Sequence, residues 1–115
     1  MSTDDPLTLH RQELRRGTVV LACLSVLRTP AYGYALLETL EDRGLHVDAN
    51  TLYPLLRRLE AQGLLDSEWN TDDARPRKFY RSTPEGRRVL AGLRAEWAEL
   101  VSAVVSRLYE AHLAQ

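Results

Sequence analysis

The sequence predicts a mainly α-helical fold with a small β-hairpin, and three observations lead to this class. A short amphipathic segment with a 3.6-residue period begins near residue 50, the period changes to 2 after Gly63, and an apolar stripe recurs every three or four residues from Leu90 to Leu108. The chain of 115 residues is long enough for one compact unit. We expect residues 1–83 to form a winged helix-turn-helix domain and residues 84–115 to form a long C-terminal helix.

The segment from residue 50 to residue 62 predicts a helix with two unlike faces. Its apolar stripe consists of leucines at i, i+3, i+4 and i+7. Pro54 lacks an N–H and belongs in a first helical turn, so the helix is expected to begin near Asn50 or Thr51. Gly63 is the expected residue after its C-terminus. The stripe is Leu52, Leu55, Leu56 and Leu59, and the residues outside it are Thr51, Tyr53, Pro54, Arg57 and Arg58.

A hairpin is predicted directly after this helix. Residues 64–69 alternate as in a half-buried strand, residues 70–74 form a polar turn, and residues 75–81 form a second strand with four cations. Phe79 and Tyr80 alternate across that strand, so one of them packs inward. A helix that exposes its N-terminal turn, followed by a hairpin with a basic tip, is typical of proteins that bind double-stranded DNA.

The helices on either side complete the predicted order. The first is expected from Leu7 to about Arg28, with Gly17 as the point where it could break, and the second from Tyr32 to Arg43, ended by Gly44. Thr83 is an N-cap residue with proline after it, so the last helix is expected to begin there and to continue to about Leu113.

Composition and charge exclude several classes of protein. The net charge is −1, yet six cations and one anion lie between Arg75 and Arg88. The single cysteine excludes an internal disulfide and fits a cytoplasmic protein, and no apolar run is long enough to span a membrane. Three scattered histidines indicate no metal site, and no nucleophile–base set indicates catalysis. We therefore expect no enzyme, no metal and no cofactor.

Candidate DNA-binding residues come from three places. The exposed helix face would reach the major groove, the wing would contact phosphates or the minor groove, and the amides at the start of the second helix would hold a phosphate beside a tyrosine hydroxyl. For this tyrosine, a tight packing turn is the alternative. Because the net charge is near neutral, a protein-interaction module without DNA binding remains the alternative function. The candidates are Asn50, Thr51, Tyr53, Pro54 and Arg57 on the helix, Arg75, Arg77 and Lys78 on the wing, and Tyr34.

Two stretches, LYPLLRRLEAQGLLDSEW and RPRKFYRSTPEGR, resemble the PadR family of transcriptional regulators, in particular its short-tailed members. The resemblance extends from about Leu14 to the C-terminus. It adds Tyr80 to the DNA-binding candidates as a motif residue, with a structural role as the alternative. It also implies a regulator that we expect to be a dimeric repressor. Two positions depart from the family pattern, since Ala74 stands where glycine is usual and Ser82 stands where an apolar residue is usual.

The stripe on the last helix predicts a homodimer. It spans roughly 27 Å at 1.5 Å per residue, too long for so small a domain to cover by itself. In some members that this chain resembles, an aromatic residue at the position of Trp97 lines a cavity for flat hydrophobic effectors, so Trp97, Val101 and Val104 are effector-binding candidates. The alternative is that Trp97 only packs the dimer interface. The interface candidates are Leu90, Leu93, Trp97, Leu100, Val101, Val104 and Leu108.

Overall fold

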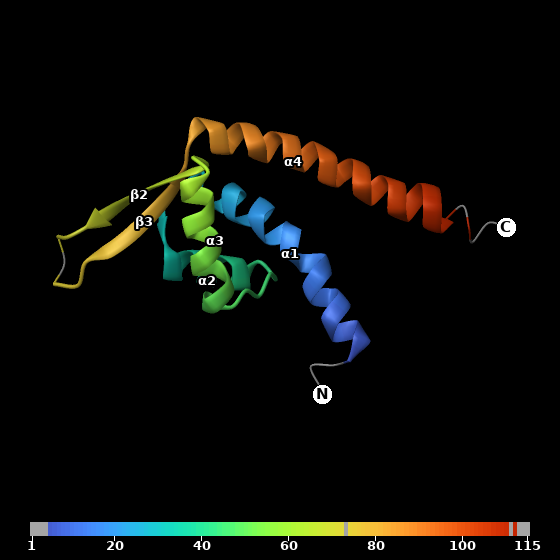
Figure 1. Cartoon of the computed structure of the whole chain (residues 1–115), viewed down its shortest axis with the longest axis horizontal. Coiled ribbons are helices and arrows are strands. Elements are labelled where there is room, and N and C mark those ends of the chain that lie inside the picture. The colour runs from blue at the N-terminus through green and yellow to red at the C-terminus, as the bar shows by residue number, and fades with distance from the viewer. Residues whose placement is uncertain (1–4, 73, 111, 113–115) are drawn as a thin grey trace.

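The computed structural model describes residues 5–72, 74–110 and 112. Helices α1, α2 and α3 pack together, the β2–β3 hairpin projects from one side of them, and α4 extends away on the other side (Figure 1). This arrangement confirms the predicted class, a winged helix-turn-helix followed by a long C-terminal helix. The elements are α1 (Pro6–Val26), β1 (Ala31–Tyr32), α2 (Gly33–Asp42), α3 (Ala49–Ala61), β2 (Leu65–Asn70), β3 (Arg77–Ser82), α4 (Pro84–Ser102) and the π-helix η1 (Ala103–Glu110).

The predicted helix ends are mostly close to the observed ones. Gly44 and Gly63 have φ angles of 91° and 78°, as residues after a helix C-terminus often do. Helix α3 begins at Ala49, earlier than expected, so Pro54 lies inside the helix rather than in its first turn. Helix α1 continues through Gly17 without a break. After α4 the chain continues as a π-helix to Glu110, and the predicted end at Leu113 lies outside the described residues.

The sheet contains a strand that the sequence did not reveal. Besides the predicted hairpin, the two-residue strand β1 pairs antiparallel with β3, which gives the strand order β1-β3-β2. Tyr80 lies in the centre, opposite Ala31 on one side and Ser67 on the other. Strand β1 immediately precedes α2, so it fixes the start of that helix against the wing.

Leucines from every helix form the core. The stripe predicted on α3 is buried as expected, and it packs against leucines of α1, α2, β2 and α4. Cys23 of α1 is fully buried among them, and burial raises the pKa of its thiol to about 12, which leaves it unreactive. None of the described helices combines the length and the apolarity needed to cross a bilayer. The core leucines are Leu24, Leu27, Leu36, Leu40, Leu52, Leu55, Leu56, Leu59, Leu64, Leu65 and Leu90.

Ser82 brings a hydroxyl into this core. Its backbone N–H donates to the carbonyl oxygen of Leu27 at 2.7 Å, but its Oγ has no hydrogen-bond partner among the described residues. A buried polar group without a partner costs free energy.

We expect Ser82→Ala to raise the free energy of unfolding by about 1 kcal/mol, measured by urea denaturation. Ser67→Ala on β2 is the matched control: its hydroxyl donates to Glu60, so the same substitution should destabilise the fold. If the two substitutions changed the free energy of unfolding equally, the Ser82 hydroxyl would not be an unpaired buried group.

Candidate nucleic-acid interface

The outer face of α3 is available to a ligand as the sequence predicted, except at one residue. Asn50, Thr51, Pro54 and Arg57 are exposed. Tyr53 is partly buried instead, because its ring packs over Gly33: a Cβ atom built at Gly33 would lie 2.5 Å from Tyr53 Cε1 and 2.9 Å from its hydroxyl oxygen. Tyr53 therefore fixes α3 against the start of α2, and the exposed residues around it form the candidate DNA-reading face.

The turn between α2 and α3 is held by a histidine between two carboxylates. His46 Nδ1 lies 2.6 Å from Glu41 Oε2, and its Nε2 lies 3.4 Å from Asp48 Oδ1. The hydrogen bond to Glu41, with the charges of both carboxylates, raises the pKa of His46. Asp48 occupies the N-cap position of α3, yet its side chain makes no capping hydrogen bond there. This cluster was not predicted, because only the folded turn brings the three side chains together.

Two tyrosines at the start of α2 contact the wing at its outer end, where β2 ends and β3 begins. The Arg77 guanidinium donates to the Tyr34 hydroxyl at 2.9 Å and lies 4.4 Å from the centroid of the Tyr32 ring. The Tyr32 hydroxyl accepts a hydrogen bond from Asn70 Nδ2 at 2.7 Å. Tyr34 remains exposed beside these contacts. Arg77 and Tyr34 were predicted separately as DNA-binding residues, and the structure brings them into contact. Tyr32 and Asn70 were not among the predicted residues.

Lys78 is engaged within the protein. Its ammonium lies 3.3 Å from Glu60 Oε1 of α3 and 5.4 Å from the centre of the Tyr80 ring, and its side chain is 29% exposed. The Glu60 carboxylate also accepts a hydrogen bond from Ser67 Oγ. The hydrogen bond from Ser67, and to a smaller extent the contact with Lys78, lower the pKa of Glu60. This contact joins the wing to α3. The expected contact of Lys78 with a phosphate stays a prediction.

Tyr80 is a correction to the predicted interface. It is 5% exposed and packs in the core, so it offers almost no surface to a duplex. Burial raises the pKa of its hydroxyl. Of the alternating pair, Tyr80 is therefore the residue that packs inward.

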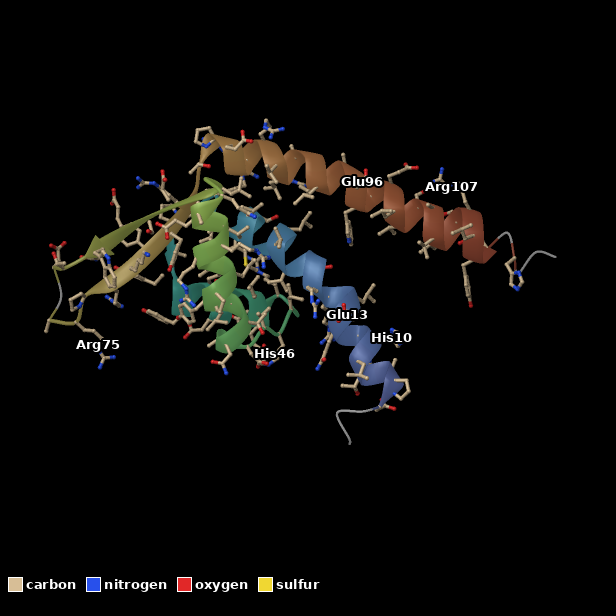
Figure 2. The ribbon with its side chains drawn as sticks, viewed as in Figure 1. His10, Glu13, His46, Arg75, Glu96 and Arg107 are labelled. Atoms are coloured by element: carbon tan, nitrogen blue, oxygen red, sulfur yellow. The ribbon has the colours of Figure 1, made fainter. Side chains whose placement is uncertain are left out.

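Arg75 is an exposed cation at the tip of the wing. It precedes β3 and lies at the outer end of the hairpin, away from the helices (Figure 2). Other cations of the basic cluster have partners, since Arg81 lies 3.4 Å from Glu68 and Arg88 lies 2.5 Å from Glu85. The positive charge that remains available is therefore concentrated at the wing tip and on the outer face of α3.

The far end of the molecule carries a second exposed surface, which we call the α4 stripe. Leu90 was predicted to belong to it but is 4% exposed and packs in the core of its own chain. Val105 and Tyr109 extend the stripe and were not predicted, because the π-helix changes the spacing of side chains that an α-helical period assumes. The stripe consists of Leu93, Trp97, Leu100, Val101, Val104, Val105, Leu108 and Tyr109.

Comparisons with known proteins identify the class. A family model described as the transcriptional regulator PadR-like family matches residues 20–92. The chain belongs to the PadR family of transcriptional regulators. The match includes α2, α3 and the wing, and it ends within α4 just before the α4 stripe begins. The resemblance suggested by the sequence is thus confirmed, and the family consists of regulators rather than enzymes.

Individual relatives of this PadR regulator agree with the family match. A transcriptional regulator of Mycobacterium tuberculosis is 40% identical over 95 residues, which cover 82% of this chain and 89% of that protein. The crystal structure of a PadR family transcriptional regulator from Eggerthella lenta matches with a TM-score of 0.86 and 54% identity, covering 92% of this chain and 95% of that one. A PadR-like transcription factor from Bacteroides fragilis matches with a TM-score of 0.71 and 35% identity, covering 82% and 93%.

Proposed function

We propose that this PadR-family regulator is a dimeric repressor that binds a pseudo-palindromic DNA operator. One observation carries the proposal: α3 exposes Asn50, Thr51, Pro54 and Arg57 on the outer face of a helix-turn-helix, beside a wing tipped by Arg75. In this arrangement α3 enters the major groove of a half-site and the wing lies on the adjacent groove. Repression follows because the bound dimer blocks access of the polymerase to the promoter.

The shape of the chain supports a dimer of two identical subunits. The radius of gyration is 17.0 Å, whereas a compact domain of this length would have about 13 Å. The excess comes from α4 and η1, which extend beyond the other helices (Figure 1). The α4 stripe leaves eight large apolar side chains uncovered on this extension. A stripe of this length along one helix fits a second copy of itself across a two-fold axis.

Dimer symmetry also sets where an effector would bind. Trp97 is 50% exposed in the single chain, with Val101 and Val104 on the following turns of the same stripe. Two copies of these residues that face each other would line an apolar space suited to a flat aromatic molecule. Such a ligand relieves repression if it binds better to a dimer whose α3 helices no longer match the half-sites.

The effector proposal is tested by release of DNA. A panel of flat aromatic compounds would be added to the protein bound to fluorescent operator, and release would be followed by anisotropy. The comparison is made at a protein concentration at which Trp97→Ala still occupies the operator, and there we expect this variant to lose its response to any active compound. A full response in Trp97→Ala would contradict the assignment of the pocket.

DNA binding itself is tested by titrating the protein against a labelled 30-base-pair duplex from upstream of its own gene. A scrambled duplex serves as competitor at several salt concentrations. We expect binding that resists the competitor and weakens linearly in the logarithm of salt concentration. If no duplex binds even at low salt, the alternative function, a protein-interaction module, is favoured.

Two arginine substitutions separate base reading from phosphate binding. We expect Arg57→Ala to weaken operator binding by about 1–3 kcal/mol and to reduce discrimination against the scrambled duplex. Arg75→Ala should weaken binding to both duplexes alike and reduce the salt slope by about 1. Arg88→Ala is the control, because Arg88 is engaged with Glu85 on α4. If all three variants bind equally well, α3 and the wing are not the interface.

A further inference from the structure

Trp69 is an exposed tryptophan on the wing that the proposed interface does not use. It lies on β2, one residue before the strand ends, and is 64% exposed. Large aromatic side chains are costly to leave in water, and exposed ones often mark surfaces that bind a partner. The position of this indole relative to α3 and the wing tip indicates which partner it meets.

The strand register places Trp69 on the face of the wing that looks toward α3. Side chains alternate along a strand, so Leu65, Ser67 and Trp69 share one face of β2. Ser67 and Lys78 both contact Glu60 of α3, and Trp69 is the register partner of Lys78. Hence the face that carries Trp69 is the one that α3 partly covers.

The burial of successive side chains on this face shows how far along β2 the helix α3 covers it. Leu65 is fully buried, Ser67 is partly buried and Trp69 is exposed, in the direction from the core toward the wing tip. Trp69 therefore lies between the outer face of α3 and the tip that carries Arg75. Lys78, the register partner of Trp69, places a cation on the same face of the wing.

A duplex that engages both α3 and the wing must pass this position. Adjacent major and minor grooves of DNA are separated by one sugar–phosphate strand, so a protein with a helix in one groove and a wing on the other has that strand between them. The charges on this face suit a polyanion. The carboxylates of Asp66 and Glu68 point to the opposite face of β2, and that of Glu60 is engaged with Lys78.

We propose that Trp69 binds the DNA backbone between the two grooves, with its ring packed on a deoxyribose and its indole N–H donating to a phosphate oxygen. Tryptophan is a hydrogen-bond donor only, which suits a phosphate, and its ring face is apolar enough to pack on a sugar. Such a contact fixes the position of the wing on the duplex and carries no sequence information. The inference rests on the proposed DNA-binding function and adds a residue to its interface.

The protein has two tryptophans, so the emission of each can be isolated. With excitation selective for indole, Trp97→Phe leaves Trp69 as the only source of tryptophan emission, and Trp69→Phe leaves Trp97. Each variant would be titrated with the upstream duplex and with the scrambled duplex at low salt, while the anisotropy of the labelled DNA reports complex formation independently. We expect the emission of Trp69 to change in step with the anisotropy, and bound DNA to protect Trp69 from acrylamide quenching.

Affinity gives a second readout. Trp69→Phe keeps the ring but loses the N–H, so we expect both duplexes to bind about three- to tenfold more weakly, with an unchanged salt slope because no charge is removed. Since Trp69 is exposed, this substitution should leave the folding transition in place. The difference in emission between the unaltered protein and Trp69→Phe gives the same signal without altering Trp97.

The outcomes separate this inference from the function on which it rests. If the anisotropy shows a complex while the emission and quenching of Trp69 stay constant and Trp69→Phe binds normally, the inference is overturned and the DNA-binding function stands. Weakening at the upstream duplex alone would mean base reading and would overturn the backbone contact. If no duplex changes the anisotropy, the DNA-binding function itself fails.

Discussion

Val101→Glu should convert the protein to a monomer and weaken operator binding by about 100-fold or more. Val101 lies near the middle of the α4 stripe, with Trp97 one turn before it and Val104 one turn after it. At a two-fold interface each substitution appears twice, so two carboxylates would be brought into one apolar contact. When one subunit of a dimer has bound its half-site, the other subunit is held at a high effective concentration near the second half-site, which raises the affinity of the dimer for the operator. A monomer has no such gain.

Sedimentation equilibrium measures the mass, and fluorescence anisotropy measures the affinity for DNA on the same samples. Ala95→Glu is the matched control, because it adds the same charge to an exposed position of α4 outside the stripe. We expect that variant to remain dimeric and to bind DNA normally. A dimeric Val101→Glu protein would place the subunit interface elsewhere, and a monomeric one with full affinity would separate dimerisation from DNA binding.

Gly86→Ala should destabilise the fold strongly, with a loss of about 3 kcal/mol in the free energy of unfolding. A Cβ atom at Gly86 would overlap the backbone carbonyl oxygen of Leu64. That carbonyl accepts a hydrogen bond from the backbone N–H of Thr83 at 3.1 Å, so it cannot withdraw without breaking the junction between α3, β3 and α4. A backbone group has no alternative rotamer, so the start of α4 must shift.

Gly92→Ala on the same helix is the matched control. A Cβ atom there meets nothing within 4 Å, so the substitution should stabilise the helix by up to about 1 kcal/mol through better helix propensity. Urea denaturation followed by circular dichroism, at one protein concentration for all variants, measures both effects. If both glycines tolerate alanine equally, the close contact between Gly86 and Leu64 does not exist in solution.

The local pattern of the sequence determined the helices and their ends. The leucine stripe of α3 is buried as its period predicted, and Gly63 has the positive φ angle expected after that helix. The hydroxyl of Thr83 accepts from the Gly86 N–H at 2.9 Å, as an N-cap residue should. These features were predictable because they depend on residues within one or two turns of each other.

Contacts between distant segments were decided only by the tertiary structure. Periodicity showed that Phe79 and Tyr80 face opposite ways, but the packing of the helices decided that Tyr80 is the buried one. Lys78 was expected at DNA, but the sheet register places it beside Glu60, which lies 18 residues earlier in the chain. Strand β1 has only two residues, too few to show a period, and it becomes a strand only because β3 lies next to it. The sequence by itself therefore determined which α-helices form and, for α2 and α3, where they end. The tertiary structure decided which polar and aromatic side chains remain exposed, because exposure depends on partners far away in the chain.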